Sequence, residues 1–244
     1  MGRWWVLSIV AVTLISTPQA MAAAKGGGYA LGIQLGLVTA GQAQMNELIK
    51  RANTRESGIS TGELNSAYEA AVSMMYRFQG TIFAAQLRPS FFYQNQSGSG
   101  NGGAFDYGLT GYSIMPILRL YPLENPFMKF YMQFGLGYGR VSGSIEENNT
   151  AAPTHGKVDF SGGAFGSMAG LGAEFCFRPQ HCISFEGNYR YMNFERLLAG
   201  NVSGSFATNS LSQATKGQEV ELDSADLAVR MGGLMFMAGY NYWF

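Results

Sequence analysis

The chain has 244 residues, with 16 acidic and 16 basic side chains, so its formal net charge at pH 7 is zero. This balance excludes a bulk electrostatic attraction to nucleic acid or to an anionic membrane surface, and we expect no nucleic-acid partner. Charged residues make up 13% of the chain, about half of their share in an ordinary soluble domain, whereas aromatic residues make up 14%.

Residues 1–24 have the layout of a secretory signal peptide. A basic start precedes an apolar run from Val6 to Ile15, and an A-x-A cleavage site follows at residues 20–22. A membrane anchor is the alternative, but the apolar run is roughly half of the ~20 residues that a spanning helix needs. We expect cleavage after Ala22 or Ala24, which leaves residues 25–244 as a single exported domain.

Eight later segments alternate apolar and polar residues with a period of two, which is typical of strands with two different faces. The pattern is clearest in residues 183–196, where Ile183, Phe185, Tyr189 and Tyr191 alternate with Ser184, Glu186, Asn188 and Arg190. In chain order the predicted strands are residues 29–37, 67–78, 82–93, 106–120, 127–141, 161–177, 183–196 and about 224–244.

The connections between these strands alternate in length. Three are short, at residues 79–80, 121–126 and 178–181, and four are long, at about 39–66, 94–105, 142–160 and 198–223. A soluble sandwich offers no reason for every short turn to lie at one end, whereas bacterial outer-membrane barrels have this asymmetry. The prediction is therefore an all-β fold, an eight-stranded antiparallel up-and-down transmembrane barrel with short periplasmic turns and four long outer loops.

The chain ends on the aromatic stretch GYNYWF, which we assign to a closing strand that pairs with the first strand. Its aromatic side chains belong in the girdle at the lipid interface. Gly239, Tyr242 and Phe244 resemble the C-terminal signal that the barrel assembly machinery of the outer membrane reads, although Met237 occupies a position that is usually polar.

In strand number and length the chain resembles the small eight-stranded outer-membrane barrels of the OmpA, OmpX and OmpW types. This resemblance covers the architecture of the whole chain and rests on no family-specific motif. It implies an integral protein of the bacterial outer membrane. The partners that it implies are outer-membrane lipid, the barrel assembly machinery and periplasmic chaperones.

An eight-stranded barrel has an interior that its own side chains nearly fill. Charged residues at inward positions form a predicted lumen cluster, which contains Arg77, Arg88, Arg119, Lys129, Glu174, Glu186 and Arg190. We expect opposite charges in this cluster to pair into a structural plug, because unpaired charges away from water are costly. An anion-selective constriction is the alternative, since basic residues outnumber acidic ones.

The inward positions of the outer half are small or flexible, namely Gly135, Gly137, Gly139, Gly166, Met168, Gly170 and Met235. They predict a shallow cup that is open to the outside and closed below. Loop 39–66 folding into the cup is the alternative. In that loop Met45, Leu48, Ile49 and Ala52 recur at helical spacing, which predicts a short amphipathic helix over the mouth.

Cys176 and Cys182 flank the third short turn, and in an exported chain such a pair predicts a disulfide. A stabilising clip is the expected role and a redox switch is the alternative. A metal site that adds His181 would have three ligands, two of them close in sequence, so we expect no metal.

The outward positions of segment 161–177 are mostly small, including Gly163, Ser167 and Ala169. Small residues permit close packing between membrane proteins, so this face predicts a contact in a homo-oligomer.

Catalysis is not expected, and no catalytic residue or cofactor is assigned. The chain has two histidines, of which His181 lies in a turn without a serine partner. His155 has Thr154 and Asp159 nearby, on a loop that also contains proline and glycine. The predicted function is a structural or surface protein with a plugged lumen and interaction-competent outer loops. The alternative is a porin-like homo-oligomer or a narrow transporter that passes or holds small apolar solutes or lipid.

Overall fold

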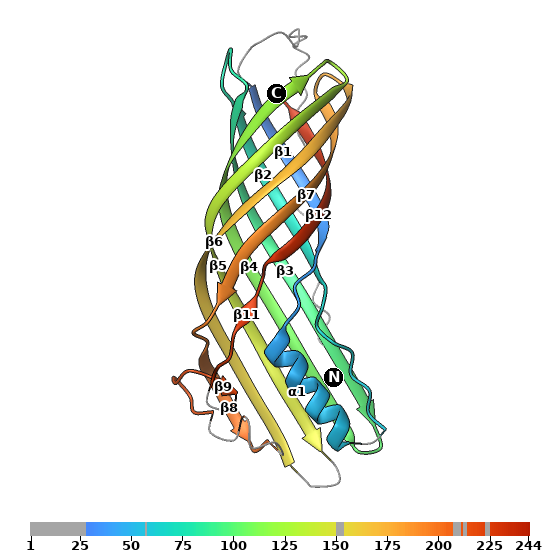
Figure 1. Cartoon of the computed structure of the whole chain (residues 1–244), viewed down its shortest axis with the longest axis vertical. Coiled ribbons are helices and arrows are strands. Elements are labelled where there is room, and N and C mark those ends of the chain that lie inside the picture. The colour runs from blue at the N-terminus through green and yellow to red at the C-terminus, as the bar shows by residue number, and fades with distance from the viewer. Residues whose placement is uncertain (1–27, 57, 150–153, 207–210, 212–213, 223–224) are drawn as a thin grey trace, which may run out of the picture.

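The computed structural model describes residues 28–56, 58–149, 154–206, 211, 214–222 and 225–244, so the predicted signal peptide lies outside it. Eight antiparallel strands form a closed barrel, as predicted (Figure 1). They are β1 (Gly28–Val38), β2 (Ala67–Arg77), β3 (Phe83–Gly100), β4 (Gly103–Glu124), β5 (Met128–Asn149), β6 (Thr154–Arg178), β7 (His181–Phe194) and β12 (Gly233–Trp243). β12 pairs with β1 and closes the ring.

Alternate side chains of the barrel strands face outward and remain exposed, and the intervening side chains are buried in the lumen. Two outward belts are rich in aromatic residues, as expected for the two interfaces of a membrane-spanning barrel. The belt near the short turns contains Tyr29, Tyr76, Phe83, Phe130, Phe177 and Phe244. The belt near the long connections, called the outer belt below, contains Tyr68, Phe91, Tyr93, Tyr112, Tyr138, Phe165 and Tyr191.

The seam between β1 and β12 pairs a glycine with a larger residue at three successive inward positions. Gly32 faces Asn241, Gln34 faces Gly239, and Gly36 faces Met237. A Cβ atom on any of these glycines would clash with the side chain opposite it. Each glycine therefore provides the space that its partner's side chain occupies.

Two of the predicted long loops are largely strand, which corrects the sequence-based boundaries. β3 continues to Gly100 and β4 begins at Gly103, so residues 94–105 form a hairpin. β5 and β6 likewise extend through most of residues 142–160. The inward residues of these extensions, such as Ile145 and Val158, are fully buried because a second layer covers them. β12 begins at Gly233 rather than near 224.

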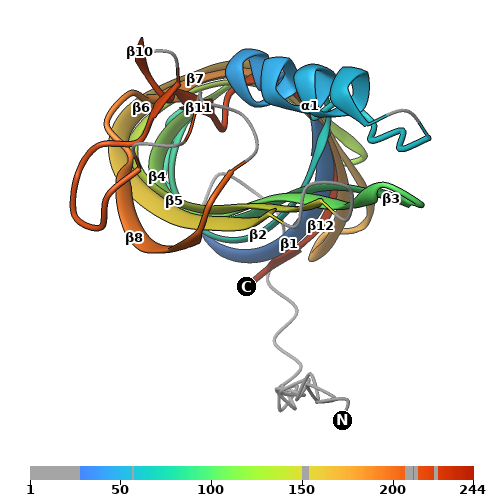
Figure 2. The same ribbon diagram turned by 90° about the horizontal axis from the view of Figure 1, so that it is seen from below.

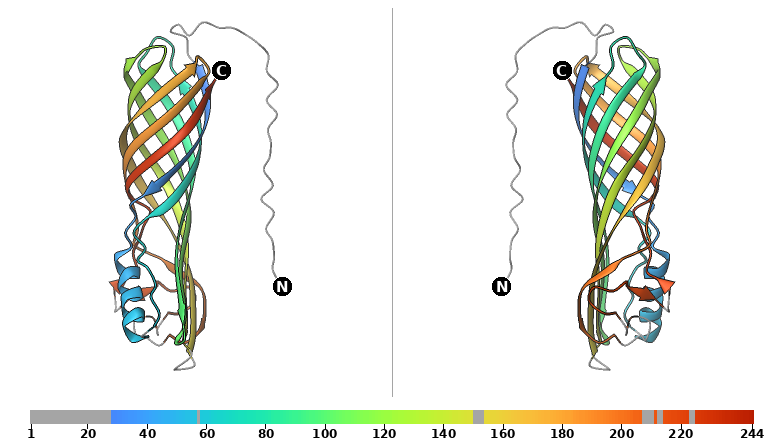
Figure 3. Two further views of the ribbon diagram at one scale, coloured as in Figure 1. Left: turned by 90° about the vertical axis from the view of Figure 1, so that its right-hand side faces the viewer. Right: turned by 90° about the vertical axis from the view of Figure 1, so that its left-hand side faces the viewer.

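Together with this second layer, the long-connection end forms a cap domain, which comprises the extensions of β3–β6 and the described residues of the connections 39–66 and 195–232. β8 (Leu198–Gly204) pairs with β6 and widens the sheet. The short strands β9 (Glu221–Leu222), β10 (Ala225–Asp226) and β11 (Val229–Arg230) and the helix α1 (Ala43–Arg55) complete the domain. Figures 2 and 3 show α1 running along one side of this extended sheet.

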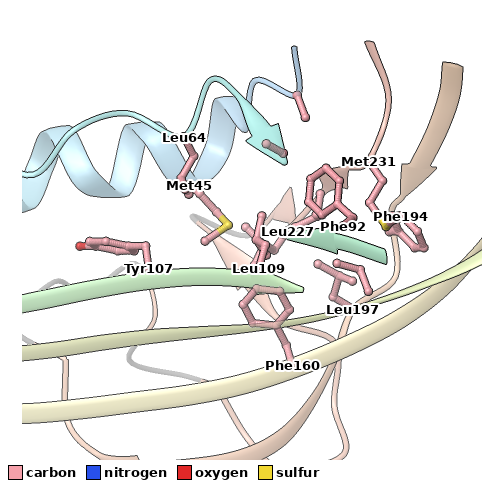
Figure 4. Close-up of a cluster of buried hydrophobic side chains, with 14 of the residues drawn as sticks. Met45, Leu64, Phe92, Tyr107, Leu109, Phe160, Phe194, Leu197, Leu227 and Met231 are labelled. Carbon is pink, nitrogen blue, oxygen red and sulfur yellow. The ribbon is translucent and has the colours of Figure 1, made fainter. Parts of the chain in front are cut away.

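The predicted amphipathic helix is confirmed, because Met45, Leu48, Ile49 and Ala52 are the buried residues of α1. It runs along one side of the ring of strands, however, and not over the mouth as predicted (Figure 2). Its buried residues pack in one apolar cluster with inward residues of the sheet, such as Leu109 and Phe160, and with Leu227 from the last connection (Figure 4). Among the described residues, no helix combines the length and the apolarity that a membrane span requires.

Candidate functional site

The lumen of the barrel is the first candidate site, and Glu186 on β7 is its centre. The carboxylate of Glu186 is fully buried and forms ion pairs with Arg88 at 2.6 Å and with Arg119 at 2.5 Å. It also accepts hydrogen bonds from Gln34, Tyr131, Gln133 and Asn188. These donors come from strands around the barrel, so one carboxylate links opposite walls of the lumen.

Arg119 on β4 connects Glu186 to the second predicted acid. Its guanidinium lies 3.2 Å from the carboxylate of Glu174 and 4.2 Å from the centre of the Tyr131 ring. Glu174 also accepts a hydrogen bond of 3.1 Å from the Tyr121 hydroxyl. Tyr121 and Tyr131 were missing from the predicted cluster, because the sequence placed Tyr121 in the short turn 121–126 and assigned Tyr131 to neither face.

A second buried ion pair joins Arg190 on β7 to Glu69 on β2. Two parallel hydrogen bonds of 2.8 and 2.7 Å connect the guanidinium with the carboxylate, a geometry that is both strong and specific. Glu69 was missing from the predicted cluster, although it lies on the polar face of segment 67–78. With it, three arginines face three glutamates in the buried network, which leaves no excess of basic groups for an anion constriction.

Two predicted members lie apart from this network, at the short-turn end. Arg77 forms a bidentate pair with Glu124 at 2.5 Å, and Lys129 lies 4.4 Å from the centre of the Trp243 ring. Glu124 belongs to β4 in the structure, whereas the sequence placed it in a turn. These contacts therefore lie at the short-turn end of the lumen and not at its centre.

The predicted cup in the outer half is absent from the described structure, because a layer of methionines fills it. Met115, Met168, Met192, Met235 and Met237 are all nearly inaccessible to solvent. A Cβ atom at Gly139 would lie 2.5 Å from Met192 Sδ, and one at Gly137 would lie 3.0 Å from Met115 Cγ. The inward glycines therefore accommodate these long side chains instead of leaving an open space.

Ion pairs and hydrogen bonds connect the C-terminal end of α1 to the sheet of the cap domain. Arg55 at the end of the helix lies 3.2 Å from both Glu56 and the buried Glu147 of β5. The Tyr107 hydroxyl donates a hydrogen bond of 2.9 Å to Glu147. Burial and the charge of Glu147 raise the pKa of Tyr107, so the phenol stays protonated and remains a donor.

The predicted disulfide between Cys176 and Cys182 is formed, at the hairpin of β6 and β7. Both thiols are used in it, which leaves none for the metal site that was the alternative. Gly239 faces the lumen, whereas Phe244 is exposed in the belt near the short turns. Recognition of Gly239, Tyr242 and Phe244 by the assembly machinery stays a prediction.

Replacing both cysteines with alanine should lower the free energy of unfolding by about 2 kcal/mol, because the bridge closes a short loop. The two residues are separated by 6 positions, and the flanking strands β6 and β7 are also joined by a backbone ladder. Urea unfolding in lipid vesicles, with and without reductant for the unaltered protein, measures this loss. Failure of the variant to fold at all would show that the bridge is needed for assembly rather than for stability.

The small residues proposed as an oligomer face do point outward from β6. Ser167 lies between Leu136 of β5 and Tyr191 of β7, and Ala169 lies between Phe134 and Tyr189. The space outside Gly163 is taken by the Tyr138 hydroxyl. The small residues are therefore flanked by large side chains, and the exposed Phe165 interrupts their row. A homo-oligomer stays a prediction that cross-linking in membranes would test.

A family model for the outer membrane protein beta-barrel domain matches residues 7–216 of the chain. No curated protein sequence is significantly similar to it. The barrel is similar to a major outer membrane protein from Thermus thermophilus, with a TM-score of 0.53, 12% identity, and coverage of 89% of this chain and 99% of that chain. At this identity the likeness shows a shared fold.

Two further solved structures have lower scores. The outer membrane protein OprG from Pseudomonas aeruginosa has a TM-score of 0.49 and 12% identity, covering 90% of this chain and 97% of that one. Ail, the attachment invasion locus protein of Yersinia pestis, has a TM-score of 0.41 and 13% identity, covering 91% of this chain and 100% of that one.

Proposed function

Because the chain belongs to the family of outer membrane proteins with a β-barrel domain, we propose that it is an integral, non-enzymatic outer membrane protein. In this proposal its lumen is closed, and its cap domain is an interaction platform outside the cell. The observation that carries the proposal is the filled lumen. A barrel that is packed along its length is suited to holding a surface domain and not to passing solutes.

Three successive layers support a closed lumen. Tyr121, Tyr131, Trp243 and the disulfide form a small buried cluster near the short turns. The ion-pair network around Glu186 follows it, and the methionines lie beyond the network. The methionines belong to the same apolar cluster as the core of the cap domain, so the packing continues from the barrel into the cap.

The surroundings of the two histidines support a non-enzymatic role. The His181 ring hydrogen-bonds with the Tyr240 hydroxyl and stacks on Phe177, at the edge of the membrane-facing surface. His155 Nε2 lies 4.0 Å from Glu146, with the side chains of both residues exposed. Among the described residues, neither imidazole ring hydrogen-bonds with the side chain of a serine, threonine or cysteine that it would activate as a nucleophile.

Planar bilayer recordings test the closed lumen. We expect the refolded wild-type protein to show no steady open-state conductance in 1 M salt, whereas an open porin recorded in the same bilayers conducts. The folded state of each sample is checked by its shifted gel mobility without heating. Steady conductance from folded wild-type protein would overturn the proposal and favour the porin-like or transporter alternative.

A further inference from the structure

A groove of about 440 Å³ lies on the outward face of the cap-domain sheet. Its lining includes Tyr93 of β3, Thr110 of β4, Ser142 and Ser144 of β5, and Asp159 and Ser161 of β6. Leu109 and Phe160 also border the groove, but they are nearly inaccessible to solvent and belong to the apolar cluster on the other face of the sheet. The groove is therefore separate from the lumen.

The strand register explains why this face is hollow. Tyr93, Thr110, Ser142 and Ser161 are consecutive partners across four strands, and Gly108, Ser144 and Asp159 form the adjacent outward row. Except for Tyr93, every member of the two rows has a short side chain. Tyr93 consequently stands at one end of a strip that also carries the hydroxyl groups of Thr110, Ser142, Ser144 and Ser161, with the carboxylate of Asp159 farther along it.

The groove continues directly from the lipid-facing surface. Tyr93 belongs to the outer belt, and the outward row on the membrane side of the groove contains Tyr112, Arg140 and Gly163. Arg140 is exposed, two residues before Ser142 and thus about 7 Å from it along β5. In the described part of the chain, the Arg140 guanidinium has no acidic partner.

This set of groups matches one kind of membrane component. An aromatic face, several hydroxyls and a carboxylate suit a saccharide, because the ring covers its apolar face and the polar groups bind its hydroxyls. An arginine without a partner suits a phosphate, to which it donates two parallel hydrogen bonds. Aromatic belts lie at headgroup level, so a groove that begins at the outer belt faces the headgroups of the outer leaflet.

We propose that the groove between Tyr93 and Asp159, together with Arg140, binds the phosphorylated saccharide headgroup of an outer-leaflet glycolipid. The site rests on the proposed function for the placement of the barrel in the outer membrane and not for the closed lumen. Conductance by the wild-type protein would therefore overturn the proposed function while leaving this site standing.

Titration of the full-length refolded protein with deep-rough lipopolysaccharide in detergent micelles tests the site. Arg140→Ala removes the phosphate contact and Ser144→Trp fills the groove, and we expect each to weaken binding at least 10-fold. Two controls should bind like the wild type. Ser97→Trp adds the same bulk at an exposed position nearer the tip of β3, and Lys50→Ala removes the same charge from α1.

Two comparison lipids separate the parts of the headgroup. Phosphatidylglycerol has the phosphate without the saccharide, and a neutral glycolipid has the saccharide without the phosphate. We expect each to bind the wild type at least 10-fold more weakly than lipopolysaccharide. The proposal would be overturned if phosphatidylglycerol bound as tightly as lipopolysaccharide, or if both site variants bound lipopolysaccharide like the wild type. It would also be overturned if the wild type were a dimer that Ser144→Trp dissociates, because a second copy of the chain would then occupy the groove.

Discussion

Replacing Glu186 with alanine should lower the free energy of unfolding of the barrel by about 3–5 kcal/mol, because it leaves a buried arginine without its counter-charge. Arg88 is 2% exposed, and in the described lumen Glu186 is its ion-pair partner. Its other hydrogen bonds in this region are weak ones to the sulfur atoms of Met168 and Met237. Equilibrium unfolding in urea, followed by tryptophan fluorescence in lipid vesicles, measures the change.

Two further variants separate the buried charge from other causes. The double variant Glu186→Ala/Arg88→Met removes both charges and should regain part of the lost stability, because Arg119 keeps its pair with Glu174. Glu47→Gln breaks the exposed pair with Arg51 on α1 and should cost less than about 1 kcal/mol. A double variant as unstable as Glu186→Ala alone would contradict the account of an uncompensated charge.

Replacing Leu48 with alanine should destabilise the docking of α1 by about 2–5 kcal/mol, while the barrel keeps its own stability. Leu48 is fully buried in the core of the cap domain, and its truncation leaves a cavity between the helix and the sheet. The effect should be local because α1 belongs to a connection between strands that are paired independently of it.

Hydrogen exchange by mass spectrometry checks this prediction. Amides of residues 43–55 should exchange faster in Leu48→Ala, and limited proteolysis should cut between residues 43 and 66, whereas the β1–β2 ladder stays protected. Lys50→Ala, on the exposed side of the same helix, should behave like the wild type. An equal loss of protection in helix and barrel would show that the two parts unfold as one unit.

The ring of eight strands could be predicted from the sequence because lipid outside and charge inside impose a strong alternation. In β7, for example, Phe185, Tyr189 and Tyr191 face outward while Glu186 and Arg190 face the lumen. Beyond the outer belt the contrast between the two faces reverses, because outward residues such as Ser142 and Asp159 are polar whereas inward residues such as Ile145 are apolar. The strand extensions were therefore predicted as loops, although their inward residues continue the same period.

The candidate sites were predicted unevenly for a related reason. Inward charges such as Arg119 and Glu186 follow from the register of single strands, but their partners depend on how distant strands meet. Glu69 and Arg190 are 121 residues apart, and no local pattern indicates that they pair. The prediction of a cup was wrong because it assumed that the space beside an inward glycine stays empty. The side chain of Met192, from another strand, fills the space beside Gly139. The outer groove likewise exists only once four strands are aligned.

The glycine pairs of the seam determine how the two ends of the chain find their alignment. β1 and β12 carry no inward charge in the described structure, so no ion pair marks the correct register between them. A slip of two residues would keep every side chain on its proper face, and the alternation of faces alone would not oppose it. Such a slip would place Gln34 opposite Met237 or Asn241, where two long side chains compete for one space. Shape complementarity at three glycines, rather than charge, thus distinguishes the correct register of β1 and β12 from the register that is shifted by two residues.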